Sequence, residues 1–91
     1  MVERTKIDEF RELMDVSGTS SVPRIAYDIL EAIINDGPKR HTDLGSGNFS
    51  LVARTLLSDQ GLVVYDAELG GFGVTDKGRE WYDSLKEAKY Q

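Results

Sequence analysis

The chain contains no cysteine, only two prolines, and no hydrophobic run near the length needed to span a membrane. Without cysteine it can form no disulfide and offers no thiolate as a zinc ligand or nucleophile. The first residues, MVERTKIDEF, are charged rather than apolar, so no secretory signal is visible and we expect an intracellular, cytoplasmic protein. Ninety-one residues suffice for one modest core, so we expect a single domain over residues 1–91.

Positive charge is also scarce, because 11 Lys and Arg residues stand against 16 Asp and Glu, a net charge of −5. Domains that bind nucleic acid are usually basic, since Lys and Arg neutralise phosphates. Residues 1–36 have a net charge of −4, residues 37–61 of +1 and residues 62–91 of −2. The middle third is therefore the segment best suited to contact phosphate.

Patterns typical of catalysis are missing as well. The stretch GSGNFS is not a phosphate-binding loop, because no strand precedes it and no Lys follows it. His41 is the single histidine, and Asp43 is its one nearby companion, which is too few ligands for a metal site. The carboxylates lie among Lys and Arg on predicted solvent faces. We expect no enzyme activity, no metal and no cofactor.

An N-terminal amphipathic helix is predicted over Glu3–Asp15. Ile7, Phe10 and Met14 recur at i, i+3 and i+7, so they share one face of this helix. The following VSGTSSVP is rich in residues that favour loops and helix caps. We therefore expect residues 1–16 to be a helix placed before a larger unit over residues 22–91.

The second helix, predicted over Pro23–Asn35, has the clearest pattern. Its apolar residues follow i, i+3, i+4, i+7, i+8 and i+11, so it should be central to the core. Ser20 or Ser21 can cap its start, and Gly37 followed by Pro38 should end it.

A short helix is predicted at Lys39–Leu44, followed by a tight turn at Gly45–Asn48. Phe49 or Ser50 should then open another helix that ends near Gln60. After this helix, LVVYD is rich in β-forming residues, AELGG suits a hairpin loop, and FGV suits a return strand.

Glycines in the stretch GGFGVTDKG predict how the hairpin turns. Gly70 and Gly71 should supply the positive φ angles of a short hairpin, and Gly73 should let the return strand lie close to the helices. Thr75 is a good N-cap for a last helix that runs to about Lys89. The order is mainly α with one small β-hairpin, an α+β class.

From Ile29 to Leu85 the chain resembles the winged helix-turn-helix family, and in particular small standalone winged-helix regulators of the archaeal type. Three stretches in order carry the resemblance: ILEAIINDGPKRHTDL, FSLVARTLLSDQGLVV and FGVTDKGREWYDSL. The resemblance implies a winged helix with an extra N-terminal helix. It also implies that the helix Ser50–Gln60 enters a DNA major groove and that the hairpin touches the minor groove or the backbone.

As function, the resemblance implies sequence-specific binding of double-stranded DNA by a transcriptional regulator. We expect a homodimer through the N-terminal or C-terminal helix, because two half-sites raise the affinity that one weakly charged domain lacks; the alternative is that the N-terminal helix packs on its own domain. The residues suited to contact DNA lie on the predicted outer stripe of the helix Ser50–Gln60, at its N-terminus or in the short helix before it: Lys39, Arg40, His41, Ser46, Asn48, Ser50, Leu51, Arg54, Thr55 and Ser58. Arg54 could read a guanine edge or a phosphate. Its alternative is a surface ion pair with Asp59 or Glu68, and the alternative for Lys39–His41 is a solvated helix start.

A second hypothesis is a winged helix that binds protein rather than DNA. The predicted DNA-contacting helix has one Arg and no Lys, its Leu51 is exposed, and the hairpin contains Asp66 and Glu68 but no basic residue. Surface charge distinguishes the two hypotheses. One face formed by Lys39, Arg40 and Arg54 favours DNA, whereas interruption of that face by Asp43, Asp59 and Glu68 favours protein.

Overall fold

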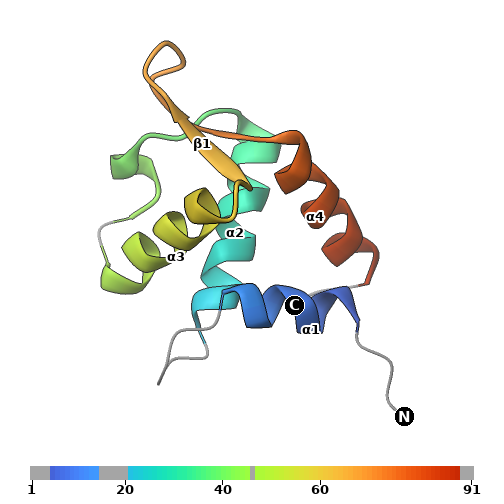
Figure 1. Cartoon of the computed structure of the whole chain (residues 1–91). Coiled ribbons are helices and arrows are strands. Elements are labelled where there is room, and N and C mark those ends of the chain that lie inside the picture. The colour runs from blue at the N-terminus through green and yellow to red at the C-terminus, as the bar shows by residue number, and fades with distance from the viewer. Residues whose placement is uncertain (1–4, 15–20, 46, 89–91) are drawn as a thin grey trace.

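Four α-helices, a 3₁₀ turn and a two-stranded antiparallel hairpin make up the described part of the computed structural model, residues 5–14, 21–45 and 47–88. In chain order the elements are α1 (Lys6–Leu13), α2 (Val22–Asp36), η1 (His41–Asp43), α3 (Asn48–Asp59), β1 (Val63–Asp66), β2 (Gly71–Val74) and α4 (Asp76–Glu87). The hairpin projects at one end, and α3 and α4 lie on either side of α2 (Figure 1). The predicted α+β class is confirmed.

Helix α2 is at the centre of the packing, since it contacts α3, α4 and β2. Its apolar residues recur every three or four positions and so form one face, on which Ile29, Leu30 and Ile33 are buried. Gly37, with a φ of 93°, ends the helix as predicted. The prediction of a helix over Pro23–Asn35 is confirmed, and the helix is one residue longer at each end.

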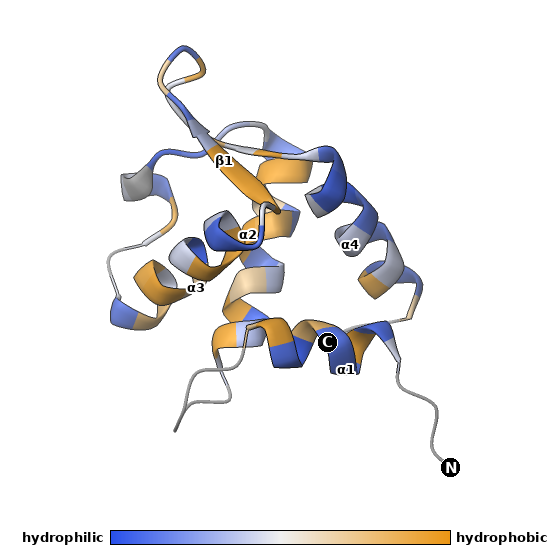
Figure 2. Ribbon diagram, in the orientation of Figure 1, coloured by the Kyte–Doolittle hydropathy of each residue, from blue (hydrophilic) through white to orange (hydrophobic). Residues whose placement is uncertain are grey.

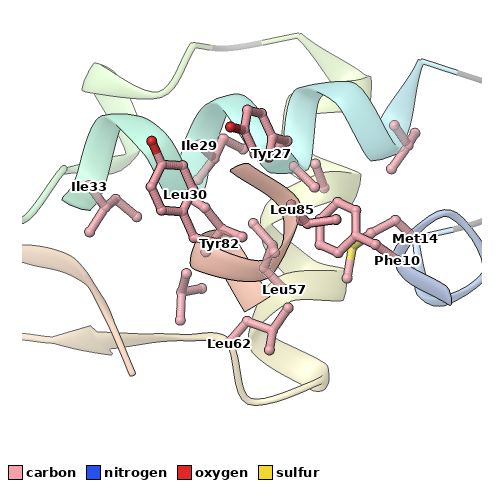
Figure 3. Close-up of a cluster of buried hydrophobic side chains, with 14 of the residues drawn as sticks. Phe10, Met14, Tyr27, Ile29, Leu30, Ile33, Leu57, Leu62, Tyr82 and Leu85 are labelled. Carbon is pink, nitrogen blue, oxygen red and sulfur yellow. The ribbon is translucent and has the colours of Figure 1, made fainter. Parts of the chain in front are cut away.

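Buried side chains from all four helices meet in one cluster (Figure 3). Its largest fully buried members are Phe10, Met14, Leu30, Leu57, Leu62, Leu85 and Val22. The N-terminal helix therefore packs on its own chain, and its Phe10 ring lies 5.9 Å from the Trp81 ring on α4, centroid to centroid. Removing a large side chain from such a core typically costs about 2–5 kcal/mol.

The first two helices begin differently from one another. Thr5 caps α1 in a capping box: its hydroxyl accepts from the Asp8 N–H (3.2 Å), and the Asp8 carboxylate accepts from the Thr5 N–H (3.4 Å). The predicted ends of this helix, Glu3 and Asp15, lie outside the described residues. Ser21 is the N-cap residue of α2, but its side chain makes no capping hydrogen bond; Ser20, the predicted alternative, lies outside the described residues.

The short helix predicted at Lys39–Leu44 is reduced to the 3₁₀ turn η1, and Lys39 does not belong to it. Lys39 instead pairs with β2, because its N–H donates to the Phe72 carbonyl (3.0 Å) and its carbonyl accepts from the Phe72 N–H (2.7 Å). Because its backbone groups are used in this pairing, Lys39 does not join a helix. It also ties the loop after α2 to the hairpin.

Gly71 and Gly73 have roles in the hairpin that differ from those predicted. Gly70 has the expected positive φ (77°), but Gly71 is a strand residue without one. A Cβ on Gly71 would lie 2.6 Å from the Lys39 carbonyl carbon, so this glycine permits the Lys39 bridge. A Cβ on Gly73 would make only an ordinary 3.6 Å contact with Leu69, so the predicted close approach there is wrong.

At the start of α4, Thr75 and Gly78 contact the turn that follows α3. The Thr75 hydroxyl accepts from the Gly78 N–H (3.0 Å) and donates to the Gly61 carbonyl (2.6 Å), which confirms the predicted N-cap. The helix ends at Glu87; the predicted end, Lys89, lies outside the described residues. Gly78 sits directly against the Leu62 carbonyl, where no Cβ can be placed without movement.

A pair of tyrosines joins α2 to α4. The rings of Tyr27 and Tyr82 stack with centroids 5.4 Å apart, and the Tyr82 hydroxyl donates to a Glu31 carboxylate oxygen (3.1 Å). Burial, followed by the hydrogen bond to Glu31 and its negative charge, raises the pKa of Tyr82 to about 12. The neutral phenol is thus part of the α2–α4 contact.

Gly78→Ala should lower the free energy of unfolding by about 1–3 kcal/mol, because the new methyl group overlaps the Leu62 carbonyl and lies 2.8 Å from a Val74 methyl. Helix propensity alone would favour Ala by about 1 kcal/mol, so the sign of the change is informative. Urea denaturation measures it. Gly47→Ala is the control for the added methyl group, since nothing lies within 4 Å of that Cβ position and its φ is −67°, and only the smaller loss of an N-cap glycine is expected there. A stabilised Gly78→Ala variant would contradict the packing of α4.

Alkaline pH should destabilise the protein through Tyr82. The unfolded phenol loses its proton near pH 10 and the folded one only near 12, so stability is present below pH 10 and is lost as pH rises between these values. Thermal melts at stepped pH values measure this loss. Tyr82→Phe should flatten the pH dependence in that range, and an identical dependence in both proteins would contradict the assigned contact.

Candidate functional site

A groove between α3 and the hairpin brings together most of the residues that the sequence predicts on the outer stripe of α3. Its volume is about 200 Å³, and it is lined by Leu51, Arg54, Thr55, Ser58, Asp59 and Phe72. We call it the α3–hairpin groove. Helix α3 begins at Asn48, one residue before the predicted start, and its last residue is Asp59. Its Ala53 and Leu57 face the core as predicted.

Arg54 is buried, with only 3% of its surface exposed, so the prediction that it points outward is wrong. Its guanidinium Nη2 donates to the Gly45 carbonyl (2.9 Å), and its Nε donates to the Ser50 carbonyl (3.3 Å). Neither of the two predicted acidic partners is needed, because backbone carbonyls accept these protons. Arg54 sits beside the buried stripe of α3, where the loop before the helix folds over it.

Ser50 serves the same loop. Its hydroxyl donates to the Leu44 carbonyl (2.6 Å), one residue before the carbonyl that Arg54 holds. Ser50 and Arg54 together fasten the Leu44–Gly45 segment to α3. Asn48, the first residue of the helix, is exposed, and the N-cap residue is Gly47, which has no side chain to cap the helix. Ser46 lies outside the described residues.

The outward stripe of α3 is otherwise as predicted. Leu51 is 45% exposed, and Thr55 and Ser58 are exposed as well. The Thr55 hydroxyl donates to the Leu51 carbonyl (2.9 Å), one helical turn earlier. Asp59 lines the same groove, so a carboxylate stands beside these exposed residues.

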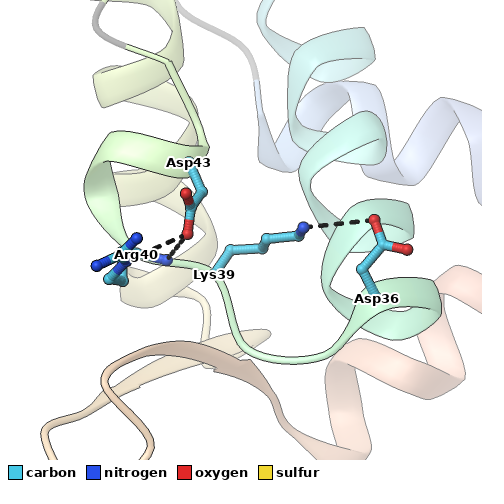
Figure 4. A network of polar contacts seen from close by, with 4 residues as sticks. All are labelled: Asp36, Lys39, Arg40 and Asp43. Carbon is cyan, nitrogen blue, oxygen red and sulfur yellow. Dashed lines mark hydrogen bonds and ion pairs between the residues drawn. The ribbon is translucent and has the colours of Figure 1, made fainter.

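The basic cluster before α3 is paired with acidic residues of its own neighbourhood (Figure 4). Lys39 Nζ lies 3.4 Å from a carboxylate oxygen of Asp36, and Arg40 Nε lies 3.5 Å from Asp43. The Arg40 backbone N–H also donates to Asp43 (3.1 Å), and this bond, with the nearby guanidinium, lowers the pKa of the Asp43 carboxyl. Nothing of the His41 side chain is described. The predicted basic face is thus interrupted by carboxylates.

Exposed apolar side chains gather on α3 and the hairpin, a feature that the sequence analysis recognised only at Leu51. Within residues 5–14, 21–45 and 47–88, the large hydrophobic residues with exposed side chains are Phe49, Leu51, Val64, Tyr65 and Leu69. The Tyr65 ring meets the Phe72 ring edge-on, with centroids 5.4 Å apart, so Tyr65 contacts one of the residues that line the groove. Figure 2 shows hydrophobic residues along β1 and near the hairpin tip.

Two of the exposed side chains, Val64 and Leu69, lie at the buried Gly73, which pairs with Val64 across the hairpin. Leu69 lies 3.6 Å from the position that a Gly73 Cβ would occupy. A strand that alternates an inward and an outward residue would normally place a polar residue at the outward position. The two successive valines in VVYD place an apolar residue at the outward position as well, and this pattern in the sequence indicates an exposed apolar side chain on the hairpin.

Acidic groups flank these apolar residues. The Asp66 carboxylate accepts from the Glu68 N–H (2.9 Å) in the hairpin turn, and Asp59 lies in the groove. The nearest Lys of α4, Lys77, donates to the Gln60 carbonyl (2.9 Å). The site can therefore bury an apolar group more readily than it can hold a phosphate.

Comparisons of the chain with protein-family models, with curated proteins and with solved structures found no match. Within the described residues, no helix has both the length and the apolar composition to span a membrane. In the same ranges, no group of three or more His, Asp or Glu side chains could hold a metal ion.

Replacing Arg54 with Met should lower the free energy of unfolding by about 2–3 kcal/mol, since the carbonyls of Gly45 and Ser50 lose a charged donor. Urea denaturation measures the change. Arg40→Ala, which removes an arginine whose side chain is 71% exposed, should change stability by no more than about 0.5 kcal/mol. Equal effects of the two substitutions would contradict the structural role of Arg54.

Proposed function

We propose that the chain is a winged-helix protein-interaction module, in which the α3–hairpin groove and the neighbouring apolar side chains bind an apolar segment of a partner protein. The observation that carries the proposal is the location of the exposed large hydrophobic residues: all of those in the described part of the chain lie on α3 or the hairpin. Leu51 lines the α3–hairpin groove with Phe72, whereas Val64 and Leu69 lie on the Gly73 side of the hairpin. Exposed apolar side chains that gather on neighbouring elements mark protein interaction sites, because burying them removes them from water.

The winged-helix assignment is supported by the order and placement of the elements. A central helix, a short turn, a second exposed helix, a hairpin and a last helix follow one another, as the resemblance implies. The hairpin stands beside α3 and projects beyond the helices (Figure 1). This arrangement gives α3 and the hairpin a shared outer surface, which is the surface that the family uses for recognition.

The charges of that surface favour protein over nucleic acid. Arg54, the main candidate for a DNA contact, donates to two backbone carbonyls and is buried. Lys39 and Arg40 are each paired with a nearby carboxylate, and Asp59 lies in the groove itself. Phosphate binding depends on cations that can replace counterions along the duplex, and this surface offers few.

Sequence-specific binding of double-stranded DNA, by a dimeric transcriptional regulator, is the second candidate. It is favoured by Arg40, whose side chain is 71% exposed in the loop before α3, and by the outward hydroxyls of Thr55 and Ser58. These groups could contact a phosphate and base edges. Binding of this kind weakens steeply as salt rises, whereas an apolar interface changes little.

Leu51→Asp should weaken binding of selected peptides by at least about tenfold, because it places a charge in the centre of the apolar surface. The peptides are selected from a displayed random library on the native chain, and their affinities are measured by fluorescence anisotropy at low and high salt. Thr42→Asp, which adds the same charge at an exposed position in η1, is the matched control and should leave affinity unchanged.

The same samples decide between the two candidates. Salt-sensitive binding to random double-stranded DNA that Arg40→Ala weakens and Leu51→Asp does not would overturn the protein-interaction proposal. Light scattering on the free protein reports whether a second copy can be the partner: a dimer that Leu51→Asp dissociates would identify a homodimer formed through this surface. If the protein binds no DNA and Leu51→Asp leaves peptide affinity unchanged, both candidates are contradicted.

A further inference from the structure

Trp81 lies between two adjoining shallow hollows on the opposite helices, α1 and α4, away from the α3–hairpin groove. One hollow, of about 550 Å³, is lined by Lys6, Glu9, Glu12, Leu13 and Trp81. The other, of about 390 Å³, is lined by Lys6, Glu80, Trp81, Asp83 and Ser84. Trp81 and Lys6 belong to both, so the half-buried indole forms the floor that the two hollows share. We call this surface the Trp81 face.

Apolar surface at the centre of the Trp81 face is surrounded by negative charge. Trp81 and Leu13 supply the apolar part, and both also pack against the core. Among the residues that the structure describes, four carboxylates and one ammonium group line the two hollows. The Trp81 ring is held in place from behind by the Phe10 ring, whose centroid is 5.9 Å away.

The chain itself shows which charge this face stabilises. Lys6 Nζ lies 4.8 Å from the centroid of the Trp81 ring and 3.4 Å from a carboxylate oxygen of Glu9. A cation over an indole is attracted by the negative face of the ring, and a neighbouring carboxylate adds to the attraction. The Lys6 side chain is 56% exposed, so an incoming cation can displace it.

We propose that the Trp81 face binds a basic segment of a partner protein. An Arg or Lys of that segment takes the place of Lys6 over the indole, a neighbouring apolar side chain covers Leu13, and further cations pair with the carboxylates on the rim. This inference concerns a second surface and stands apart from the proposed function of the α3–hairpin groove. A second copy of the chain is a poor occupant, because it would set two acidic rims against each other.

Fluorescence reports on this face directly, since Trp81 is the single tryptophan of the chain. The probe is a short synthetic peptide with arginines around a central leucine, and the control peptide has glutamates in place of the arginines. The basic peptide should change the Trp81 emission saturably, with an affinity that falls as salt rises. The acidic peptide should cause no change.

Matched variants separate this face from general attraction between a basic peptide and an acidic protein. Glu80→Lys and Asp83→Lys should each weaken peptide binding by at least about tenfold. Asp59→Lys makes the same charge change in the α3–hairpin groove and should leave the affinity nearly unchanged. Lys6→Ala should tighten binding several-fold, because it removes the resident cation.

Three results would overturn the proposal. One is equal weakening by Asp59→Lys and Glu80→Lys, which would show that only net charge matters. Another is no response of Trp81 to the basic peptide, as expected if a segment of the chain itself occupies the face. The third is a change of Trp81 emission with protein concentration alone, which would identify a second copy as the occupant. Leu51→Asp should affect none of these measurements, so failure of the proposed function would be recognised separately.

Discussion

The burial of α2 against three other elements is the constraint on which the remaining structure depends. Because α2 packs on α3, α4 and β2, the hairpin is held next to α3. The Lys39–Phe72 backbone bridge then ties the loop after α2 to the same hairpin. The α3–hairpin groove is the consequence: two elements that belong to one core share an outer edge that nothing in the described chain covers.

Arg54 links this architecture to function. A guanidinium on α3 can either face a ligand or satisfy backbone carbonyls, and here it binds Gly45 and Ser50 within the chain. Burying a cation is costly unless its protons find acceptors, so these contacts are also what makes the burial possible. The one arginine of α3 is therefore engaged within the chain, and Leu51 and Phe72 supply the apolar lining of the α3–hairpin groove.

Local pattern was sufficient to predict the long helices and the hairpin, but not the short η1 turn or the contacts of single polar residues. The apolar period of α2 and the Thr75 cap depend on neighbours in sequence, and both are confirmed. The predictions for Arg54 and Lys39 were wrong because their partners are distant in sequence. Arg54 donates to the carbonyl of Gly45, in the loop before α3, and Lys39 pairs with Phe72, which is 33 residues away. A helical projection assigns Arg to solvent by default, and it contains no information on either contact.

Hydrogen exchange of the arginine Nε–H protons, followed by NMR, tests most directly whether the Arg54 guanidinium is bound within the chain and is therefore not available to a ligand of the α3–hairpin groove. The Arg54 Nε–H donates to the Ser50 carbonyl in a buried position, whereas the Arg40 side chain is largely exposed. The Arg54 resonance, assigned by its loss in Arg54→Met, should exchange with water far more slowly than that of Arg40 and should not shift when double-stranded DNA is added. Fast exchange at Arg54, or a shift of its resonance by DNA, would contradict the account.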